Sequence, residues 1–441
     1  MRRIAVIGAG YVGLVTAACL SELGNDVVCA DSDAAKIDRL ASGVLPFYEP
    51  SLGEIVTRNA SAGRLSFTTE TADAVRAGSI IFIAVGTPMG AGGQADLSYV
   101  CEAAREVGAA LHGPQIVVSK STVPVESGSR IASIVRESSS SGAPVRFVSN
   151  PEFLREGSAV ADFLRPDRIV IGTSDSEAVA VMRELYAPLN APFVVTDIRT
   201  AEMIKYAANA FLATKISFIN EIAEICELFA VDVREVCHGM GYDPRIGTRY
   251  LDPGIGFGGS CLPKDVRALG QLAAERDYAA PLLHAVELVN REQAERIVRK
   301  IDRGLSGLGD KTVAVLGLAF KPNTDDVRDA PALRIIRRLI ERGASIRAHD
   351  PVANEAARAG LGPCVAFFDD MYGAVAGCDA VLVATEWSQF RTIDLERCAE
   401  LMRGDLVVDG RNVYDPADVR AANLRYVGVG RGARATAKLP G

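Results

Sequence analysis

Short apolar runs alternate with helical patterns in two separate parts of the chain, and this feature constrains the fold most. In the first 200 residues the apolar runs are RRIAVIG, DVVCAD, SIIFIAVG, QIVVSKS, VRFVSN and DRIVIG. The alternation returns after residue 311 with TVAVLGLAF, ASIRAHDP, CDAVLVATEW and DLVVDGRN. Such alternation indicates βαβ units and a mainly parallel sheet. We therefore expect an α/β protein with two Rossmann-like, doubly wound domains.

A segment of 31 residues without glycine or proline separates the two parts. It runs from Thr200 to Ala230 and keeps apolar residues at helical spacing, which predicts one long helix. Helical patterns resume in DVRALGQLAAERD and PLLHAVELVNREQAERIVRKI. We expect three domains and a tail that is small, basic and disordered. They are an N-terminal Rossmann-like domain over 1–199, a central all-helical domain over 200–300, a C-terminal Rossmann-like domain over 311–430 and the tail over 431–441.

The composition is that of a globular cytoplasmic protein. The chain has 49% hydrophobic and 23% charged residues, and a net charge of −7 gives no reason to expect nucleic acid or a membrane as a partner. Nine cysteines without a CxxC pair predict reduced thiols and no metal site. Arg2 and Arg3 before an uncharged stretch imitate a secretory signal. The three glycines in that stretch favour a strand, a turn and a helix instead.

Those glycines have the GxGxxG spacing of a dinucleotide-binding turn. They directly follow the first apolar run, and Asp31 ends the next one, 18 positions after Gly13. An acid at this distance suits the adenosine ribose and repels a 2′-phosphate, so the pattern favours NAD over NADP. A glycine turn on another α/β sheet remains the alternative. The residues of the turn are Gly8, Gly10, Tyr11, Val12 and Gly13.

Two threonines follow later strands of the same half. Thr87 in AVGTP and Thr122 in SKSTVP stand at the carboxyl ends of expected strands, where ligands bind in open α/β sheets. Each could also simply end its strand. The second half lacks the glycine pattern, because Phe320 and Lys321 stand near the position of the third glycine. This difference suggests another phosphate ligand, such as a nucleotide sugar.

Lys205 and Asn209 are four residues apart on the expected long helix and so share one face. The apolar neighbours Met203 and Phe211 suggest that much of this helix is buried. A buried lysine needs a partner, and a lysine with an amide can stabilise an alkoxide or oxyanion. A lysine that extends its ammonium group to the solvent at the helix edge remains the alternative.

Cys261 lies in GFGGSCLPKD, directly before an expected helix that has Pro263 in its first turn. A helix N-terminus and the nearby Lys264 both favour the nucleophilic thiolate. Asp265 follows four residues later and could act as a base or hold water. We expect the surrounding glycines to let the backbone approach a ligand. Most cysteines are packing residues, but Cys261 does not lie in an apolar run.

Other catalytic chemistries lack their patterns. The sequence has no GxSxG or HExxH motif, and its four histidines do not pair at metal-ligand spacing. A zinc alcohol dehydrogenase built on Cys261, Cys237 and His238 is a remaining alternative without support from the spacing.

Seven motifs in order give the chain a recognisable resemblance. They are the GxGxxG turn, STVP, NPEFLREGSAVADFLRPDRIVIG, KYAANAFLATKISFINE, GFGGSCLPKD, GLAFKPNTDDVRDAP and DGRN. Together they resemble the UDP-glucose/GDP-mannose dehydrogenase family over nearly the whole chain, with the UDP-glucose 6-dehydrogenase branch nearest. The resemblance implies NAD-dependent oxidation of UDP-glucose to UDP-glucuronate, with two NAD consumed.

The resemblance also implies residue roles. Cys261 is the nucleophile that forms a thiohemiacetal and then a thioester, and Lys205 and Asn209 stabilise the oxyanions. Asp265 and Thr122 orient or activate water, and Glu152 has an acid–base or water role. The NAD contacts are Gly8, Gly10, Tyr11, Val12, Gly13, Asp31, Lys36, Thr87, Thr122, Glu156, Lys264 and Arg328. The substrate contacts are Glu152, Phe153, Leu154, Arg155, Lys205, Asn209, Arg245, Tyr250, Gly254, Phe257, Gly258, Cys261, Phe320, Lys321 and Arg411.

The resemblance further implies at least a homodimer that packs through the long helix, with Arg245 reaching the site of a neighbouring subunit. Three alternatives remain open. A sister enzyme would oxidise GDP-mannose or UDP-N-acetylmannosamine, since pocket shape decides the sugar. A β-hydroxyacid dehydrogenase would perform one oxidation and would not need Cys261. An inactive nucleotide-sugar sensor would not need the set of reactive residues.

Overall fold

The computed structural model describes residues 1–90, 93–142 and 144–431, and the chain divides into two compact units. The first unit is Met1–Ala208 and the second is Asn209–Gly441. The domain boundaries expected at 199, 300 and 311 stay predictions. The tail expected to be disordered lies outside the described residues, except for its first residue.

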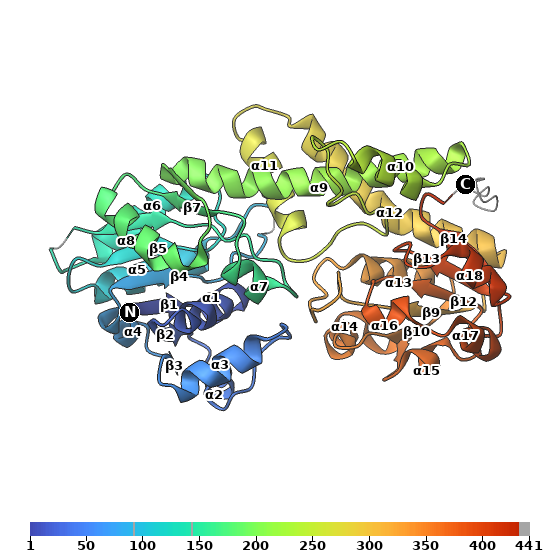
Figure 1. Cartoon of the computed structure of the whole chain (residues 1–441), viewed down its shortest axis with the longest axis horizontal. Coiled ribbons are helices and arrows are strands. Elements are labelled where there is room, and N and C mark those ends of the chain that lie inside the picture. The colour runs from blue at the N-terminus through green and yellow to red at the C-terminus, as the bar shows by residue number, and fades with distance from the viewer. Residues whose placement is uncertain (91–92, 143, 432–441) are drawn as a thin grey trace. The chain divides into compact units, whose positions relative to one another are not determined.

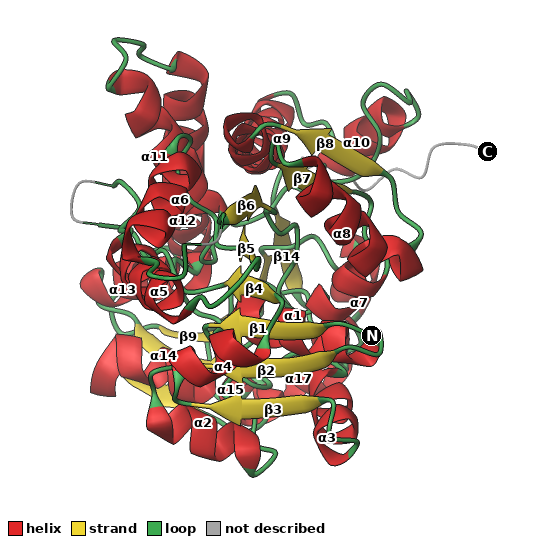
Figure 2. Cartoon of the chain, turned by 90° about the vertical axis from the view of Figure 1, so that its left-hand side faces the viewer, coloured by secondary structure: helices red, strands yellow, loops and turns green. Residues whose placement is uncertain are grey.

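The first unit contains an eight-stranded sheet in the order β3-β2-β1-β4-β5-β6-β7-β8 (Figure 2). All neighbouring strands are parallel except β6 and β7, which form one antiparallel pair at Ser149 and Gly172. Each apolar run singled out in this half of the sequence forms a strand, as expected. The strands are β1 Arg3–Ile7, β2 Asp26–Ala30, β3 Leu65–Thr68, β4 Ile80–Ile83, β5 Ile116–Ser119, β6 Arg146–Ser149, β7 Ile169–Gly172 and β8 Phe193–Thr196.

Helices cover both faces of this sheet because its central strands are apolar on both sides. In β1, Ile4 and Val6 belong to one buried core and Ala5 and Ile7 to another. Successive side chains of a strand point to opposite faces, so a continuous apolar run can fill two cores. The helices are α1 Tyr11–Glu22, α2 Ala34–Ala41, α3 Leu52–Ser61, α4 Thr71–Ala77, α5 Ser98–Ala110, α6 Ser127–Ser138, α7 Ala159–Leu164, α8 Ser176–Tyr186 and the short η1 Ala187–Leu189.

The second unit contains a six-stranded, fully parallel sheet in the order β11-β10-β9-β12-β13-β14. Its central strand also divides between two cores, with Val313 and Val315 in one and Ala314 and Leu316 in the other. The expected second Rossmann-like fold is therefore present. The strands are β9 Thr312–Leu316, β10 Ser345–His349, β11 Val365–Phe367, β12 Ala380–Val383, β13 Leu406–Asp409 and β14 Arg425–Gly428.

Further helices complete the second unit around this sheet. Pro331 opens α13 at its first residue, where a missing backbone N–H has no cost. These further helices are α10 Val233–Gly241, α11 Leu262–Ala274, α12 Pro281–Leu305, α13 Pro331–Glu341, α14 Asn354–Leu361, the short η2 Gly362–Cys364, α15 Met371–Val375, α16 Ser388–Arg391, α17 Leu395–Leu401 and α18 Pro416–Ala421.

The expected long helix is present as α9, Ile198–Leu228, which spans 31 residues (Figure 1). It begins in the first unit and continues into the second. Lys205 and Asn209 are both buried, as expected, but Met203 and Phe211 are 43% and 64% exposed. The expectation that much of this helix is buried holds on the side of Lys205 and Asn209, whereas Met203 and Phe211 lie on another face and are exposed in the single chain.

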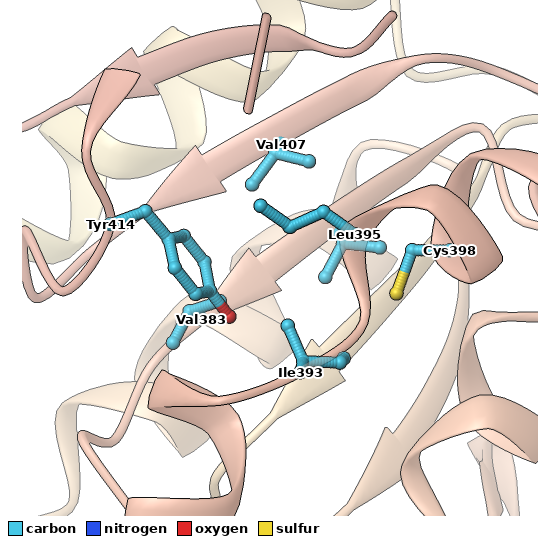
Figure 3. A pocket seen from close by; sticks show the side chains of 7 residues that line it. Val383, Ile393, Leu395, Cys398, Val407 and Tyr414 are labelled. Carbon is cyan, nitrogen blue, oxygen red and sulfur yellow. The ribbon is translucent and has the colours of Figure 1, made fainter. Parts of the chain in front are cut away.

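A small cavity of about 10 Å³ lies inside the second unit (Figure 3). Its walls are mainly aliphatic, and the hydroxyl group of Tyr414 donates a hydrogen bond to the carbonyl oxygen of Phe390. The cavity has space for about one water molecule, and the one hydroxyl group in its lining already donates to a backbone carbonyl, so the cavity is a packing defect and not a ligand site. Its lining residues are Val381, Val383, Ile393, Leu395, Cys398, Val407 and Tyr414.

No helix in the described part of the chain has the length and apolar character needed to cross a membrane.

Candidate active site

Each of the three G positions of the GxGxxG turn is a glycine for a different structural reason. Gly8 has a φ of +103°, and a Cβ atom there would lie 2.8 Å from the Ala84 carbonyl oxygen. A Cβ atom on Gly13 would lie 1.8 Å from the Gly8 carbonyl oxygen, so α1 can approach the turn only without a side chain. Gly10 has nothing within 4 Å and is the N-cap of α1, which leaves room for a phosphate at the helix N-terminus.

Gly10→Ala and Gly13→Ala should therefore fail in different ways. Gly10 has a φ of −74°, which alanine adopts freely, so we expect a stable fold with NAD binding weakened about tenfold, or 1.4 kcal/mol. Gly13→Ala must displace the backbone, and we expect a loss of stability of about 3 kcal/mol. Thermal unfolding and NAD titration check both results. Normal NAD affinity in a stable Gly10→Ala protein would contradict the role of this turn.

Asp31 lies at the end of β2 and orders the same turn. Its carboxylate accepts hydrogen bonds from the backbone N–H groups of Ala9 (2.8 Å) and Asp33 (3.0 Å) and from Lys36 Nζ (2.8 Å). Burial raises the pKa of Asp31, but these donors outweigh it and the pKa lies below its ordinary value. Three donors leave acceptor capacity for a ribose hydroxyl, so the site fits NAD.

Asp31→Asn should change the choice between dinucleotides. The amide keeps the shape of the side chain but loses the charge that repels a 2′-phosphate and strengthens the ribose hydrogen bond. We expect the KM for NAD to rise about tenfold, a loss of about 1.4 kcal/mol, while use of NADP becomes measurable. Steady-state kinetics with each cofactor check this. An unchanged preference for NAD would remove Asp31 from the cofactor site.

Lys205 and Glu152 form a buried ion pair in the first unit. The distance from Lys205 Nζ to Glu152 Oε1 is 2.9 Å, and each side chain is 4% exposed. Burial raises the pKa of Glu152, but the Lys205 ammonium group outweighs this and keeps the pKa below its ordinary value. Glu152 is thus a carboxylate that also accepts the backbone N–H of Leu154. The expectation that Lys205 is buried with a partner is confirmed.

Thr122 and Thr87 lie together at the carboxyl ends of β5 and β4. The Thr87 hydroxyl donates to the Thr122 carbonyl oxygen at 2.9 Å. Thr122 and Lys205 also line one small pocket with Glu202 and Ser149. The structure therefore brings the expected groups Thr122, Lys205 and Glu152 to one edge of the sheet, beside the strand-order switch at β1 and β4.

Sequence reasoning missed Lys120, which is buried in the same region. Its Nζ donates to Asn150 Oδ1 at 3.1 Å, and the Tyr186 hydroxyl donates to the same oxygen at 2.7 Å. The available signal was a lysine that follows the apolar run IVVS directly. Its partners lie on two other elements, so the sequence could not name them.

Glu202 was also missed. It precedes Lys205 by three residues on α9, and its carboxylate accepts the backbone N–H groups of Glu126 (2.8 Å) and Gly128 (2.6 Å) at the start of α6. A Cβ atom on Gly128 would lie 2.6 Å from Glu202 Oε1, so the glycine is required for this approach. Burial raises the pKa of Glu202 to about 7. The carboxylate ties the segment after Thr122 to the helix that carries Lys205.

The segment 152–159 is tied to the dinucleotide turn through Glu49. The buried Glu49 carboxylate accepts the backbone N–H groups of Gly157 (2.6 Å) and Ala159 (2.7 Å) and the hydroxyl of Tyr11. Glu156 lies close enough for its charge to contribute to the raised pKa of Tyr11, after burial and Glu49. Expected cofactor and substrate residues therefore share one network.

The expected substrate contacts in that segment have partners within the first unit. The Phe153 ring lies 3.5 Å from the guanidinium group of Arg168 and 5.3 Å from Lys205 Nζ. Arg155 is largely exposed and pairs with Asp162 of α7. Contact of these residues with a substrate stays a prediction.

Cys261 is the N-cap of α11 in the second unit, where the sequence placed it. Its Sγ lies 3.5 Å from the Ser260 hydroxyl oxygen. Asp265, 1% exposed, lies in the first turn of the same helix and accepts hydrogen bonds from Asn209 Nδ2 and Lys264 Nζ, each at 2.6 Å. The structure thus brings two expected groups, Asn209 and Lys264, to the buried carboxylate of a third, Asp265.

The glycines before Cys261 have a structural reason besides the expected approach to a ligand, which stays a prediction. Protein groups lie within 3 Å of the Cβ positions of all four. The groups are Gly410 O at 2.9 Å from Gly254, Asn290 Oδ1 at 2.7 Å from Gly256, Asp329 O at 2.4 Å from Gly258 and the Phe320 ring at 2.8 Å from Gly259. Asn290 also bonds both the N–H and the carbonyl of Phe257. The loop is thereby packed against its own unit.

Four expected substrate contacts meet at the carboxyl edge of the second sheet. Arg411 follows β13, and its guanidinium group donates to the carbonyl oxygens of Ala384 (2.9 Å) and Phe320 (3.3 Å). A Cβ atom on Gly254 would lie 3.3 Å from an Arg411 nitrogen, and Lys321 Nζ lies 5.2 Å from the Phe320 ring. These groups lie beside the strand-order switch at β9 and β12. They form a basic, partly aromatic edge suited to a nucleotide phosphate.

The position in the second unit that corresponds to Asp31 is closed. Asp350 follows β10 and accepts the backbone N–H groups of Leu318, Ala319, Val352 and Ala353. The indole N–H of Trp387 makes a fifth contact at 3.4 Å. A carboxylate has about four lone-pair sites, so Asp350 has none left for a ribose.

Three further expected residues, Arg245, Arg328 and Tyr250, have different surroundings. Arg245 is exposed and pairs with Asp243, and Arg328 pairs with Asp326. Tyr250 has a φ of +65°. Their ligand contacts stay predictions. Within the described residues, no group of three His, Cys, Asp or Glu side chains could hold a metal ion.

Three domains of one family match the chain. Residues 2–190 match the NAD binding domain of the UDP-glucose/GDP-mannose dehydrogenase family, residues 199–292 its central domain and residues 314–416 its UDP binding domain. The chain belongs to this family. It is an NAD-dependent oxidoreductase, and the predicted resemblance is confirmed.

Individual relatives cover almost the whole dehydrogenase. It is 48% identical to UDP-glucose 6-dehydrogenase TuaD of Bacillus subtilis over 98% of this chain and 94% of that protein. A UDP-glucose dehydrogenase structure from Pyrobaculum islandicum matches with a TM-score of 0.91 and 42% identity, over 98% of both chains. A UDP-D-ManNAc dehydrogenase structure from Pyrococcus horikoshii matches with a TM-score of 0.86 and 28% identity, over 97% of this chain and 99% of the other.

Proposed function

We propose that the enzyme oxidises UDP-glucose to UDP-glucuronate in a four-electron reaction. The observation that carries this proposal is Cys261 at the N-cap of α11, one turn before a buried Asp265 that is bonded to Asn209 and Lys264. A dehydrogenase that stops at the aldehyde needs no nucleophile. Relatives named for UDP-glucose, at 48% and 42% identity, favour this sugar.

Different residues of the chain have different roles in this reaction. NAD, when bound, accepts a hydride in each oxidation. Gly8, Gly10 and Asp31 hold it, and Arg411 and Lys321 bind the nucleotide phosphates of the substrate. Lys205 and Asn209 stabilise the negative oxygen on C6 as each hydride leaves.

Cys261 keeps the aldehyde from being released. Its sulfur adds to the C6 aldehyde and forms a C–S bond, and the aldehyde oxygen takes up a proton, which gives a thiohemiacetal. Loss of a second hydride and of that proton gives the thioester. Water, oriented by Asp265 and Thr122, then cleaves the C–S bond and releases the carboxylate and the thiol. Glu152, held as a carboxylate by Lys205, accepts a proton during these steps.

The NADH yield tests the proposal. With UDP-glucose limiting, NAD in excess and the reaction complete, we expect two NADH for each sugar. One NADH for each sugar would show release of an aldehyde and would overturn the role of Cys261. No NADH with UDP-glucose, together with turnover of UDP-N-acetylmannosamine or GDP-mannose, would assign the enzyme to a sister activity. That second candidate rests on the fold shared with the UDP-D-ManNAc dehydrogenase.

We also propose a homodimer that packs through α9, with Arg245 contributed to the neighbouring subunit. Four apolar side chains of the second unit lie exposed along this helix at spacings of seven, seven and three residues, which makes one stripe. Exposed apolar stripes mark interaction sites. The stripe consists of Phe211 (64% exposed), Phe218 (42%), Ile225 (44%) and Leu228 (81%).

Phe218→Glu should therefore dissociate the dimer. A carboxylate placed in the stripe would be buried without a partner in the dimer, which is costly. Size-exclusion chromatography with light scattering should show a monomer, whereas Glu102→Ala on the exposed face of α5 should leave the assembly unchanged. A Phe218→Glu protein with the mass of the wild-type assembly would place the interface elsewhere.

A further inference from the structure

Lys120 is a buried ammonium group whose role the proposed reaction does not explain. The residue is 6% exposed, and its Nζ donates to the neutral Asn150 Oδ1 at 3.1 Å. Within the part of the chain that the structure describes, no carboxylate lies within 4 Å of this nitrogen. A buried cation without a carboxylate partner is costly, so a packing role explains Lys120 poorly.

The Asn150 amide is oriented to receive this cation. Its Nδ2 donates to the Val170 carbonyl oxygen at 2.7 Å, so its Oδ1 must point the other way. The Tyr186 hydroxyl donates to the same Oδ1 at 2.7 Å, and Lys120 Nζ lies 5.8 Å from the centre of the Tyr186 ring. Elements β5, β6, β7 and α8 thus fix the ammonium group in one position.

Three cations near Lys120, counting Lys120 itself, act on one buried carboxylate, Glu152. Glu152 attracts the charge of Lys120 and Lys205 repels it. Lys205 already pairs with Glu152 at 2.9 Å, and Glu202, which lines a pocket with Lys205, has a pKa raised by burial to about 7 and is therefore only partly ionised at neutral pH. Arg168, held near Asp167, adds a third cation that acts on Glu152. The cluster therefore places a positive potential at the edge of the sheet where Thr122 and Lys205 lie.

We infer that Lys120 is a positioning residue that adds its fixed positive charge to that of Lys205 beside the Glu152 carboxylate and supplies positive potential for the negative oxygen formed at Lys205. This inference rests on the proposed function, because it needs an oxyanion at that position. Lys120 itself acts through the pair and through its fixed charge, with Asn150 and Tyr186 as its support. Burial lowers the pKa of Lys120 to about 8, so this charge is lost just above neutral pH.

Lys120→Met tests the inference, with Tyr186→Phe as the matched control. Both variants remove one donor from Asn150 Oδ1, but only the first removes charge. For Lys120→Met we expect kcat to fall about tenfold, the size of effect that a unit charge has over several ångströms. The acidic limb of the plot of kcat against pH should move to higher pH, because Glu152 loses a neighbouring cation that lowers its pKa. We expect kcat of the wild type to decline above about pH 8, where Lys120 loses its proton. This decline should be absent from Lys120→Met, and Tyr186→Phe should keep both limbs.

Stability provides a second readout that does not depend on turnover. The pKa of Lys120 is 10.5 in the unfolded chain and about 8 in the folded one. Between these values the unfolded chain keeps a proton that the folded chain has released, so stability rises with pH. This rise should be present in the wild type and absent from Lys120→Met. At pH 7 the variant should melt at the same or a higher temperature, because it no longer buries an unpaired charge.

The outcomes separate the inference from the proposed function. A Lys120→Met protein that melts earlier but keeps both pH limbs and its kcat would make Lys120 a packing residue and overturn the inference. If this variant does not fold, Lys120→Gln keeps a donor for Asn150 and gives the same comparison. If wild-type enzyme forms no NADH from UDP-glucose, the proposed function fails, while the stability curves still decide whether Lys120 carries a buried charge.

Discussion

Cys261→Ser should lower the steady-state rate of NADH formation from UDP-glucose by about 10³-fold or more, the usual loss when a catalytic nucleophile is removed. A serine hydroxyl at the N-cap of α11 fits the helix equally well, so the fold should remain unchanged. The serine hydroxyl is a much weaker nucleophile than a thiol, because it is not ionised near neutral pH. The effect should therefore appear in kcat and not in the melting temperature.

Cys364→Ser provides the control, since Cys364 is an exposed free thiol in the short helix η2. This variant should keep the wild-type rate and should isolate the effect of position 261. A Cys261→Ser enzyme that forms two NADH for each sugar at the wild-type rate would contradict the thioester mechanism. Reaction progress followed at 340 nm, with stopped-flow resolution of the first turnover, gives both quantities.

Lys205→Met should reduce both activity and stability. The lost ammonium group is the proposed partner of the oxyanion, and removal of such a donor costs about 10²–10³ in kcat. The substitution also leaves Glu152, 4% exposed, without its ion-pair partner, and breaking a buried pair costs about 3 kcal/mol or more. Kinetics and denaturant unfolding measure the two losses separately.

The double variant Glu152→Gln/Lys205→Met separates them further. Removing both charges should restore most of the stability without restoring activity. Lys300→Met, which breaks the more exposed pair with Glu227, should leave the rate unchanged. Wild-type activity in Lys205→Met would exclude the lysine from the reaction.

The sheets and the long helix could be predicted because they depend on local sequence. A strand buried on both faces must be apolar throughout, and RRIAVIG and TVAVLGLAF have this character. The N-terminal position of Cys261 on its helix was also predictable, because Pro263 marks a first helical turn. These features need no information about residues far away in the chain.

The networks around the site could not be predicted, because their partners are far apart in sequence. Glu49 and Gly157 are 108 residues apart, and Asn209 and Asp265 are 56 apart. Nothing local to Glu49 distinguishes it from a surface carboxylate. The packing of the glycines before Cys261 could not be predicted for a related reason, since a glycine admits a ligand or another backbone equally well, and here the groups nearest their Cβ positions are protein.

The saturated carboxylate of Asp350 imposes a sequence of events on turnover. With five N–H groups already directed at it, the second sheet has no ribose acceptor at this position, so in the proposed four-electron reaction the Gly8–Asp31 turn must serve both oxidations. The first reduced dinucleotide must therefore leave and an oxidised one must enter while the half-oxidised sugar is still retained. The dwell time of that sugar on the enzyme must exceed the time for dinucleotide exchange, and slow exchange would make loss of the aldehyde the competing fate.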